Sequence, residues 1–277
     1  MVSEDRLAQQ KEIARTLGVT EEFDAARELE RRVGFLADYL VQIGLGAYVL
    51  GISGGVDSLA AGCLAQRAVE RVRQQGRQAQ FIAMRLPYGT QRDEDEAQQS
   101  LRVIQPDMTV TVNIKSAADG MLQAVKAGDV AFRDPHHEDF QMGNIKARQR
   151  MIAQYAVAGA HGGLVIGTDH AAEALMGFFT KFGDGAADIT PLSGLNKRRV
   201  RALAALMGAP DSLVQKVPTA DLESLQPLKP DEEAFGVTYA EIDDFLEGKP
   251  VSDRAFDIIV RTYQGSAHKR ALPVEPR

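Results

Sequence analysis

Residues 47–58 read Ala47-Tyr48-Val49-Leu50-Gly51-Ile52-Ser53-Gly54-Gly55-Val56-Asp57-Ser58. The first half is a short apolar run that ends at glycine, which is typical of a buried strand. The second half is a glycine-rich turn, and the residues after it, 57–75, have a helical pattern. The stretch therefore predicts a strand, a tight turn and a helix, the unit from which parallel α/β sheets are built.

The same alternation continues along the chain to about residue 190. We expect further strands at 79–85, 108–114 and 163–167, and helices at 93–104, 116–127 and 140–159. Strands separated by helices imply right-handed crossovers and a parallel sheet. The predicted fold class is therefore α/β, with a three-layer, doubly wound parallel sheet.

Helical patterns flank this sheet in the sequence. They cover 4–17 and 21–43 before it, and 196–207, 210–216, 238–247 and 252–264 after it, while 217–236 is rich in Pro, Asp and Glu and is expected to be a long loop. We expect one domain, with amino-terminal helices in 1–45, a sheet core in 46–190 and a helical carboxy-terminal layer in 191–277. A separate helical domain is the alternative, but this segment is small for a core of its own.

Composition narrows the class of protein. The chain has 277 residues, of which 44% are hydrophobic and 25% charged, and it has no run of about 18 apolar residues that predicts a membrane span. Its first residues are too polar for a secretory signal. The net charge of −6 gives no electrostatic reason to expect nucleic acid as a partner. The single cysteine, Cys63, excludes an internal disulfide and favours a reducing, cytoplasmic location.

The glycine turn predicts a phosphate site. Ligands of open parallel sheets bind beyond the carboxyl ends of the strands, and residues 51–58 occupy such an end. Small residues there let the backbone approach an anion, the next helix aims its first N–H groups at the same place, and Ser58 offers a hydroxyl donor. The turn has no Gly-Lys-Ser/Thr ending, and Gly44-x-Gly46 lacks a third glycine, so neither the Walker nor the dinucleotide pattern is present. A turn that merely joins a strand to a helix is the alternative.

Asp57 favours the phosphate site over that alternative. A carboxylate inside an anion-binding turn repels phosphate unless a cation lies between them, so we expect Asp57 to hold Mg²⁺, which in turn holds the polyphosphate. Asp57 as an ordinary helix N-cap stays open as a second interpretation.

These residues carry a family resemblance. Residues 53–58 match in full the Ser-Gly-Gly-x-Asp-Ser signature of the N-type ATP pyrophosphatases, which bind ATP, release pyrophosphate and leave an adenylated substrate. The rest of the chain resembles ammonia-dependent NAD⁺ synthetase over nearly its whole length, in segments 86–89, 143–148, 150–155, 167–173, 178–185, 218–222 and 268–270. The resemblance implies an adenine nucleotide alpha hydrolase-like sheet and a homodimer with substrate sites near the subunit boundary.

The resemblance also implies the reaction. The carboxylate of the nicotinic acid ring of deamido-NAD⁺ attacks the α-phosphorus of ATP, pyrophosphate leaves, and ammonia attacks the resulting NAD-adenylate to give NAD⁺ and AMP. Another adenylating ligase of this superfamily, acting on a nucleobase or tRNA, is one alternative, although the mild acidity argues against tRNA. A non-catalytic nucleotide-binding protein is the other, but it has no need of Asp57, Glu173, Lys181 and Lys197 together.

The family's functional positions transfer to residues of the same type here. For ATP they are Gly51, Ile52, Ser53, Gly54, Gly55, Val56, Asp57, Ser58, Thr168, Lys197 and Thr219; for Mg²⁺, Asp57 and Glu173; for deamido-NAD⁺, Arg148, Lys181, Asp188, His268 and Lys269. Asp57, Lys181 and Asp188 are the implied catalytic residues, and Asp188 is a candidate to deprotonate ammonium. The one departure is Val56, where the family usually has Gln.

Several expectations concern the surroundings of these residues. Thr168-Asp169 is expected to begin a helix, with Glu173 about one turn further in, and His136-His137 is expected in a polar loop. Cys63 lies in an apolar helix and is expected to be a structural thiol, so free ammonia is the predicted nitrogen donor unless a separate subunit supplies it. The apolar stripes on 21–43 and 140–159 are candidate dimer surfaces, and a core face explains each equally well.

Overall fold

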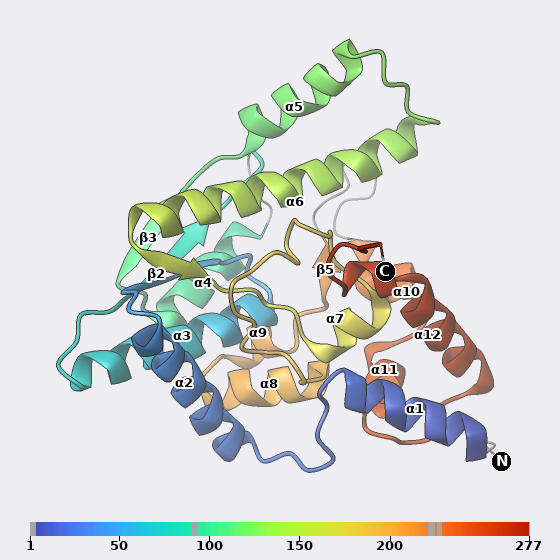
Figure 1. Cartoon of the computed structure of the whole chain (residues 1–277), viewed down its shortest axis with the longest axis horizontal. Helices are drawn as coiled ribbons and strands as arrows, with labels where there is room; N and C mark the ends of the chain where they lie inside the picture. Colours follow the sequence, from blue (N-terminus) through green and yellow to red (C-terminus); the bar gives the residue numbers. More distant parts are fainter. Residues whose placement is uncertain (1–3, 90–92, 221–224, 226–228, 277) are drawn as a thin grey trace.

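The sheet decides the architecture. The structure is a computed structural model that describes residues 4–89, 93–220, 225 and 229–276. In this part of the chain, strands β1 (Ala47–Gly51), β2 (Gln80–Arg85), β3 (Met108–Thr111) and β4 (Gly163–Val165) form one parallel sheet in the order β3-β2-β1-β4 (Figure 1). Helices cover both faces of this sheet, which confirms the predicted fold class.

The central strand β1 is apolar on both sides because each side packs against helices. Tyr48 and Leu50 point into one buried cluster, whereas Ala47 and Val49 point into the cluster on the opposite face. Residues 47–51 pair in register with 80–84 of β2, and 47–49 pair with 163–165 of β4. Burial on both faces explains why the strand reads as a continuous apolar run rather than as an alternating one.

The helices form the two outer layers. On one face lie α2 (Ala25–Gln42), α3 (Val56–Gln74), α4 (Glu94–Ile104) and α8 (Lys197–Leu206). On the other lies the long α6 (Pro135–Ala160), and α5 (Lys115–Ala127) packs against α6 (Figure 1). Among the described residues, no helix is both long and apolar enough to cross a membrane.

The order of the strands creates a switch point between β1 and β4. The chain runs from β1 outward through β2 to β3, and then crosses the opposite face to place β4 on the free side of β1. At such a point the connections leave the sheet in opposite directions and open a crevice beyond the strand ends, where ligands bind. Two segments border this crevice here: the turn that follows Gly51 and the segment 166–170 that follows Val165.

A second cluster joins the two ends of the chain. It contains α7 (Ala171–Met176), α10 (Asp231–Phe235), α11 (Tyr239–Leu246) and α12 (Asp253–Gly265), while the short α9 (Asp211–Val214) packs on α8 and the 3₁₀ helix η1 (Ala267–Lys269) follows α12. Ile13 of α1 (Glu4–Thr16) belongs to the same cluster, so the first helix packs on the carboxy-terminal helices rather than beside α2 (Figure 1).

Two expected elements differ in the structure. The strand expected at 163–167 ends at Val165, and Ile166 continues it only as a single bridge to Ile189. The loop expected over 217–236 contains β5 (Thr219–Ala220), which pairs antiparallel with β6 (Lys229–Pro230), and then α10. Strands of two residues are too short to show a period of two, so the sequence pattern gave no sign of them.

The start of α6 was also placed too late. The helix begins at Pro135 rather than near 140, because Asp134 accepts a hydrogen bond from the backbone N–H of His137 and Pro135 occupies the first helical position, where proline is favoured. His136 and His137 therefore lie in the first turn of a helix, and the prediction of a polar loop was wrong.

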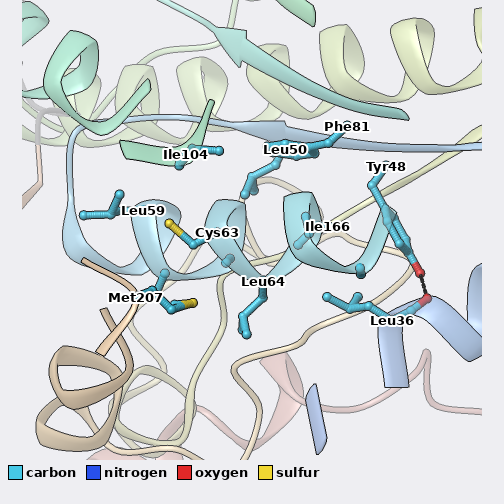
Figure 2. Packing of buried hydrophobic residues seen from close by; sticks show 14 of the residues in the cluster. Leu36, Tyr48, Leu50, Leu59, Cys63, Leu64, Phe81, Ile104, Ile166 and Met207 are labelled. Carbon is cyan, nitrogen blue, oxygen red and sulfur yellow. Dashed lines mark hydrogen bonds between the residues drawn. The ribbon is translucent and has the colours of Figure 1, made fainter. Parts of the chain in front are cut away.

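The core beneath the switch point is densely packed. The hydroxyl of Tyr48 donates to the backbone oxygen of Leu36 at 2.8 Å, which ties β1 to α2 (Figure 2). Cys63 and Leu64 lie on the buried side of α3 in the same cluster. Burial raises the pKa of the Cys63 thiol to about 11, so it stays protonated at neutral pH, as expected of a structural cysteine.

We expect Leu64→Ala to lower the free energy of unfolding by about 3 kcal/mol, because it leaves a cavity in this packed cluster. Leu206→Ala on α8 is the matched control: Leu206 is 48% exposed, so the same truncation is expected to cost less than about 1 kcal/mol. Urea unfolding of both variants measures the difference. Equal losses in the two variants would contradict the assigned core.

Candidate functional site

The glycine turn can only be built with glycine at its centre. Gly54 has a φ of +85°, and a Cβ atom there lies 2.9 Å from the backbone nitrogen of Ala97 in α4. The hydroxyl of Ser58 donates to the Gly55 oxygen at 3.1 Å and accepts from the Ser53 N–H at 3.3 Å, which closes the turn. The turn is thus fixed from both sides and leads straight into the amino terminus of a 19-residue helix.

Asp57 is not the N-cap of that helix. Gly55 holds the cap position, and Asp57 is the second residue of α3. The interpretation of Asp57 as a helix cap is therefore wrong, and its carboxylate is available for other contacts. Val56 is buried in the core cluster, so this position presents backbone rather than a side chain to the crevice.

Three side chains from the starts of α7 and α8 lie beside Asp57. Its Oδ2 accepts from the Lys197 ammonium at 2.7 Å, while its Oδ1 lies 3.4 Å from His170 Nε2. The same Nε2 is 3.6 Å from Glu173 Oε1. The structure thus brings together Asp57, Glu173 and Lys197, three residues that the sequence pointed to separately, and adds His170, which it did not.

The charges of this group are interdependent. Burial favours the neutral form of Asp57, but Lys197 and His170 outweigh it and hold the pKa of Asp57 well below its usual range. Burial and the charge of Asp57 raise the pKa of Glu173 well above its usual range. Lys197 is buried, yet Asp57 and Glu173 raise its pKa, so it remains an ammonium ion. When both carboxylates are ionised, the Lys197 ammonium ion therefore neutralises only one of the two negative charges.

Backbone hydrogen bonds hold Lys197 in place. It is the first residue of α8, and the Asp243 carboxylate of α11 accepts from the backbone N–H groups of Lys197 and Arg198 at 2.9 and 2.8 Å. The ammonium nitrogen also lies 4.9 Å from the ring centre of Tyr239. The Tyr239 hydroxyl in turn donates to Asp231 Oδ2 at 2.9 Å, which links Lys197 to the segment after β6.

His170 is the N-cap of α7. Its Nδ1 accepts from the backbone N–H of Glu173 at 3.4 Å, and the helix starts at Ala171. The expectation that Thr168-Asp169 begins this helix was wrong, because a histidine takes the capping role usually given to Ser, Thr, Asp or Asn. Glu173 lies in the first turn and faces the strand ends, as expected.

The residues present fit a divalent cation. One ligand atom each of Asp57, His170 and Glu173 lies within 4.8 Å of the others. Within the described residues, the buried Asp57 Oδ1 and His170 Nε2 have no hydrogen-bond partner of good geometry. Two carboxylates with one nearby ammonium, and a buried carboxylate oxygen without a hydrogen-bond partner, suit a cation that prefers oxygen ligands.

Asp57, Glu173 and Lys197 line a cavity of about 440 Å³ at the switch point, a size typical of small-molecule sites. Its charged residues are Arg85, Arg150, Lys197, Lys216 and Lys269, together with Asp57, Asp93, Glu173, Asp184 and Asp231. Five basic and five acidic side chains therefore face the cavity. The basic side chains do not outnumber the acidic ones, so a further cation would help this lining to bind a polyphosphate.

The predicted ATP residues surround this cavity. Most of the turn, Thr168, Lys197 and Thr219 line it, whereas Gly54 lies behind it against α4. Lys216 also lines the cavity. Its ammonium nitrogen lies 3.6 Å from Glu96 and 4.0 Å from Asp93, at the start of α4.

The predicted substrate residues form a second group. Lys269 lines the cavity and donates to the Gly177 and Phe179 oxygens at 2.9 Å. Arg148 donates to the Lys181 oxygen at 3.2 Å, and the Lys181 ammonium donates to the His268 oxygen at 2.5 Å. Arg148, Lys181 and His268 lie beside the cavity and are not part of its lining.

Asp188 also lies outside the lining. Its carboxylate accepts from the Val165 N–H at 2.8 Å and from the Tyr155 hydroxyl at 3.4 Å. Of these two nearby carboxyl groups, only that of Asp184 lines the cavity, and burial raises its pKa. Asp184, His170, Asp231 and Tyr239 were missed in the sequence. The first two lie within the matched segments, but nothing local separates them from capping or surface residues.

Comparison with known proteins identifies the family. The family model described as NAD synthase matches residues 28–273. The chain belongs to the NAD synthase family. It is 67% identical over 270 residues to the NH(3)-dependent NAD(+) synthetase of Streptomyces coelicolor, covering 98% of each chain. The resemblance predicted from the sequence is thereby confirmed.

Solved structures agree with this family membership. The crystal structure of NAD+ synthetase from Burkholderia pseudomallei is 58% identical, with a TM-score of 0.85 over 99% of this chain and 100% of that one. The structure of NMN synthetase from Francisella tularensis is 34% identical, with a TM-score of 0.80 over 92% of this chain and 99% of that one. The same fold thus also occurs in a protein whose name gives a mononucleotide, NMN, as its product.

The carboxyl group of Asp169 gives this site a pH-dependent stability. Burial, and to a smaller extent Asp184, raise its pKa from 3.8 to about 7. The folded chain therefore binds this proton more tightly than the unfolded chain, and stability is lost as the pH rises through about 7. We expect Asp169→Asn to become more stable relative to the natural chain between pH 5 and pH 8, by about 1–3 kcal/mol.

Urea unfolding at the two pH values measures this change. Asp38→Asn, on the exposed side of α2, is the control and is expected to show the same small effect at both. An Asp169→Asn effect that does not vary with pH would contradict the buried carboxyl group.

Proposed function

We propose that this chain joins ammonia to the nicotinic acid carboxylate of deamido-NAD⁺, with ATP as the activating substrate. The carboxylate attacks the α-phosphorus and releases pyrophosphate; ammonia then attacks the adenylated carbonyl carbon and releases AMP. The products are NAD⁺, AMP and pyrophosphate, so the chain carries out the last step of NAD⁺ biosynthesis. The sequence identity of 67% to an NH(3)-dependent NAD(+) synthetase over 98% of both chains favours this acceptor over a nucleobase or tRNA.

The observation that carries the proposal is the position of the Asp57–Lys197 pair at the end of the glycine turn. The turn and the amino terminus of α3 offer N–H groups to phosphate oxygens. Lys197, Lys216 and Lys269 add positive charge to the same cavity. A preorganised set of donors of this kind stabilises charge that builds up on the α-phosphate in the transition state.

Asp57 and Glu173 are the residues that would hold Mg²⁺. When bound, the metal neutralises phosphate charge and orients the polyphosphate. The shortage of one cation at these two carboxylates supports this assignment, as does the equal number of acidic and basic groups in the cavity.

The second group of residues supports a site for the dinucleotide acid. Arg148, Lys181, His268 and Lys269 come from three separate segments and extend the positive surface from the cavity towards the exposed face of α6. Asp188 remains a prediction as the base for ammonium, and its hydrogen bonds to Val165 and Tyr155 favour a role in holding the substrate side of the site. The cytoplasmic location also stays a prediction.

We assign free ammonia as the nitrogen donor. The one cysteine, Cys63, is buried in the core and its pKa of about 11 leaves it protonated, so it does not suit a glutaminase nucleophile. The sequence has no other cysteine, so no other thiol is present to act as a glutaminase nucleophile.

A homodimer through α6 suits the exposed residues of this helix. Arg148, Ile152 and Tyr155 follow one another at helical spacing on its exposed side, and Ile152 is 52% exposed. An apolar stripe beside a charged substrate residue is typical of an interface that borders a site. The stripe on α2, by contrast, supplies Val33, Leu36 and Leu40 to the core.

The first experiment is product analysis. With ATP, Mg²⁺, deamido-NAD⁺ and ammonium, we expect one NAD⁺ and one AMP per ATP consumed. Glutamine in place of ammonium is expected to give no turnover, and nicotinic acid mononucleotide is expected to be at least tenfold slower than the dinucleotide. A preference for the mononucleotide would contradict deamido-NAD⁺ as the substrate and would indicate a mononucleotide substrate instead.

Asp57→Ala is expected to abolish ATP–pyrophosphate exchange, because it removes both the metal ligand and the partner of buried Lys197. Asp38→Ala, on the exposed side of α2, is expected to leave exchange unchanged. Thermal unfolding distinguishes loss of the site from loss of the fold. Near-normal exchange in folded Asp57→Ala would refute the assignment.

The dimer surface is tested by placing a charge on each candidate stripe. Ile152→Glu is expected to convert the dimer to a monomer, because a buried unpaired carboxylate destabilises an interface. Phe35→Glu on α2, where the side chain is 48% exposed, is expected to leave the mass unchanged. Sedimentation velocity measures the oligomeric state of both variants. A monomer for Phe35→Glu and a dimer for Ile152→Glu would place the interface on α2 instead.

A further inference from the structure

The group of Asp57, His170 and Glu173 raises the question of what the imidazole does. Two carboxylates and one histidine within 4.8 Å of one another make a donor set that transition metals such as Zn²⁺ accept readily. Mg²⁺, in contrast, takes oxygen ligands. The role of His170 therefore decides which class of metal the site selects.

We propose that His170 is a positioning residue whose Nε2–H faces the two carboxylates, and that it is not a metal ligand. This inference rests on the proposed metal site at Asp57 and Glu173 and deepens it. It makes the site an oxygen-only one, selective for hard divalent cations such as Mg²⁺ or Mn²⁺.

The hydrogen bonding of the ring determines where its proton lies. His170 Nδ1 accepts from the Glu173 backbone N–H, so Nδ1 carries a lone pair and no proton. A neutral imidazole has one N–H group, which must then be on Nε2. A protonated Nε2 has no lone pair to give to a metal.

The environment of Nε2 agrees with this tautomer. Asp57 Oδ1 lies 3.4 Å away and Glu173 Oε1 lies 3.6 Å away, and both atoms are acceptors. An N–H group between two carboxylate oxygens is attracted to both, whereas a lone pair there is repelled by both. A proton on Nδ1 would point at the Glu173 backbone N–H, and the hydrogen bond that caps α7 would be lost.

The ring has no freedom to adopt another role. His170 is 1% exposed and is held as the N-cap between the switch-point segment and α7. Lys197 binds Asp57 Oδ2 and His170 Nε2 lies 3.4 Å from Oδ1, so each oxygen of this carboxylate faces one of the two side chains. Outer hydrogen-bond partners of this kind orient metal ligands and tune their affinity.

The tautomer is measured directly by long-range ¹H–¹⁵N correlation of the ring nitrogens in the full-length protein labelled at histidine. The spectrum of His170→Asn identifies the His170 signals among those of the five histidines. We expect the Nε2–H form, unchanged when Mg²⁺ or Zn²⁺ is added. An Nδ1–H form, or a metal-shifted Nε2 without its proton, would overturn the inference.

Binding of Mn²⁺, followed by electron paramagnetic resonance in the presence of ATP, tests the positioning role. His170→Ala is expected to weaken Mn²⁺ binding at least tenfold, whereas His170→Asn, which keeps a capping oxygen and an N–H donor, is expected to stay within threefold. His161→Asn, at the exposed end of α6, is the control. Unchanged binding in folded His170→Ala would refute positioning.

The two experiments also separate this inference from the proposed function. If the natural chain binds no Mn²⁺ with ATP, the metal site itself fails, and the positioning role fails with it. If Mn²⁺ binds and the His170 ring shows direct coordination, the metal site stands and only the inference about His170 is lost.

Discussion

The ion pair between Asp57 and Lys197 joins residues that are 140 positions apart in the sequence, and the active region depends on it. It holds the start of α3 against the start of α8, and so fixes the phosphate turn relative to the carboxy-terminal helices. A buried pair of this kind adds little net stability by itself, but losing one partner leaves an unpaired buried charge. The pair therefore specifies one arrangement of the two layers around the cavity.

The fold supplies the place for this pair through the order of its strands. Because β4 lies on the other side of β1 from β2, the turn after Gly51 and the segment around His170 border the same crevice. Residues from both then share one set of charges. Lys197 and His170 hold Asp57 ionised, whereas burial and the charge of Asp57 raise the pKa of Glu173. A divalent cation between the two carboxyl groups would favour the ionised form of Glu173.

The residues proposed to bind deamido-NAD⁺ lie partly in the cavity and partly beside it. Lys269 lines the cavity, while beside it Arg148 donates to the Lys181 backbone oxygen and the Lys181 ammonium donates to the His268 backbone oxygen. A substrate with two nucleotide halves suits such a layout, because its reacting end must meet ATP while its other end needs an extended surface. The relative named NMN synthetase shares the fold at 34% identity, so the fold alone does not decide the substrate.

The sequence by itself determined the parallel sheet, the phosphate turn and the family. Those features depend on local patterns: an apolar run buried on both faces, glycine at a positive φ, and a signature of six adjacent residues. Only the tertiary structure decided that His170 caps α7, that Asp231 and Tyr239 support Lys197, and that Asp184 rather than Asp188 lies in the cavity. The physical reason is that each of these roles depends on contacts between segments far apart in the chain. Packing of whole layers sets those contacts, and no spacing within a single segment records them.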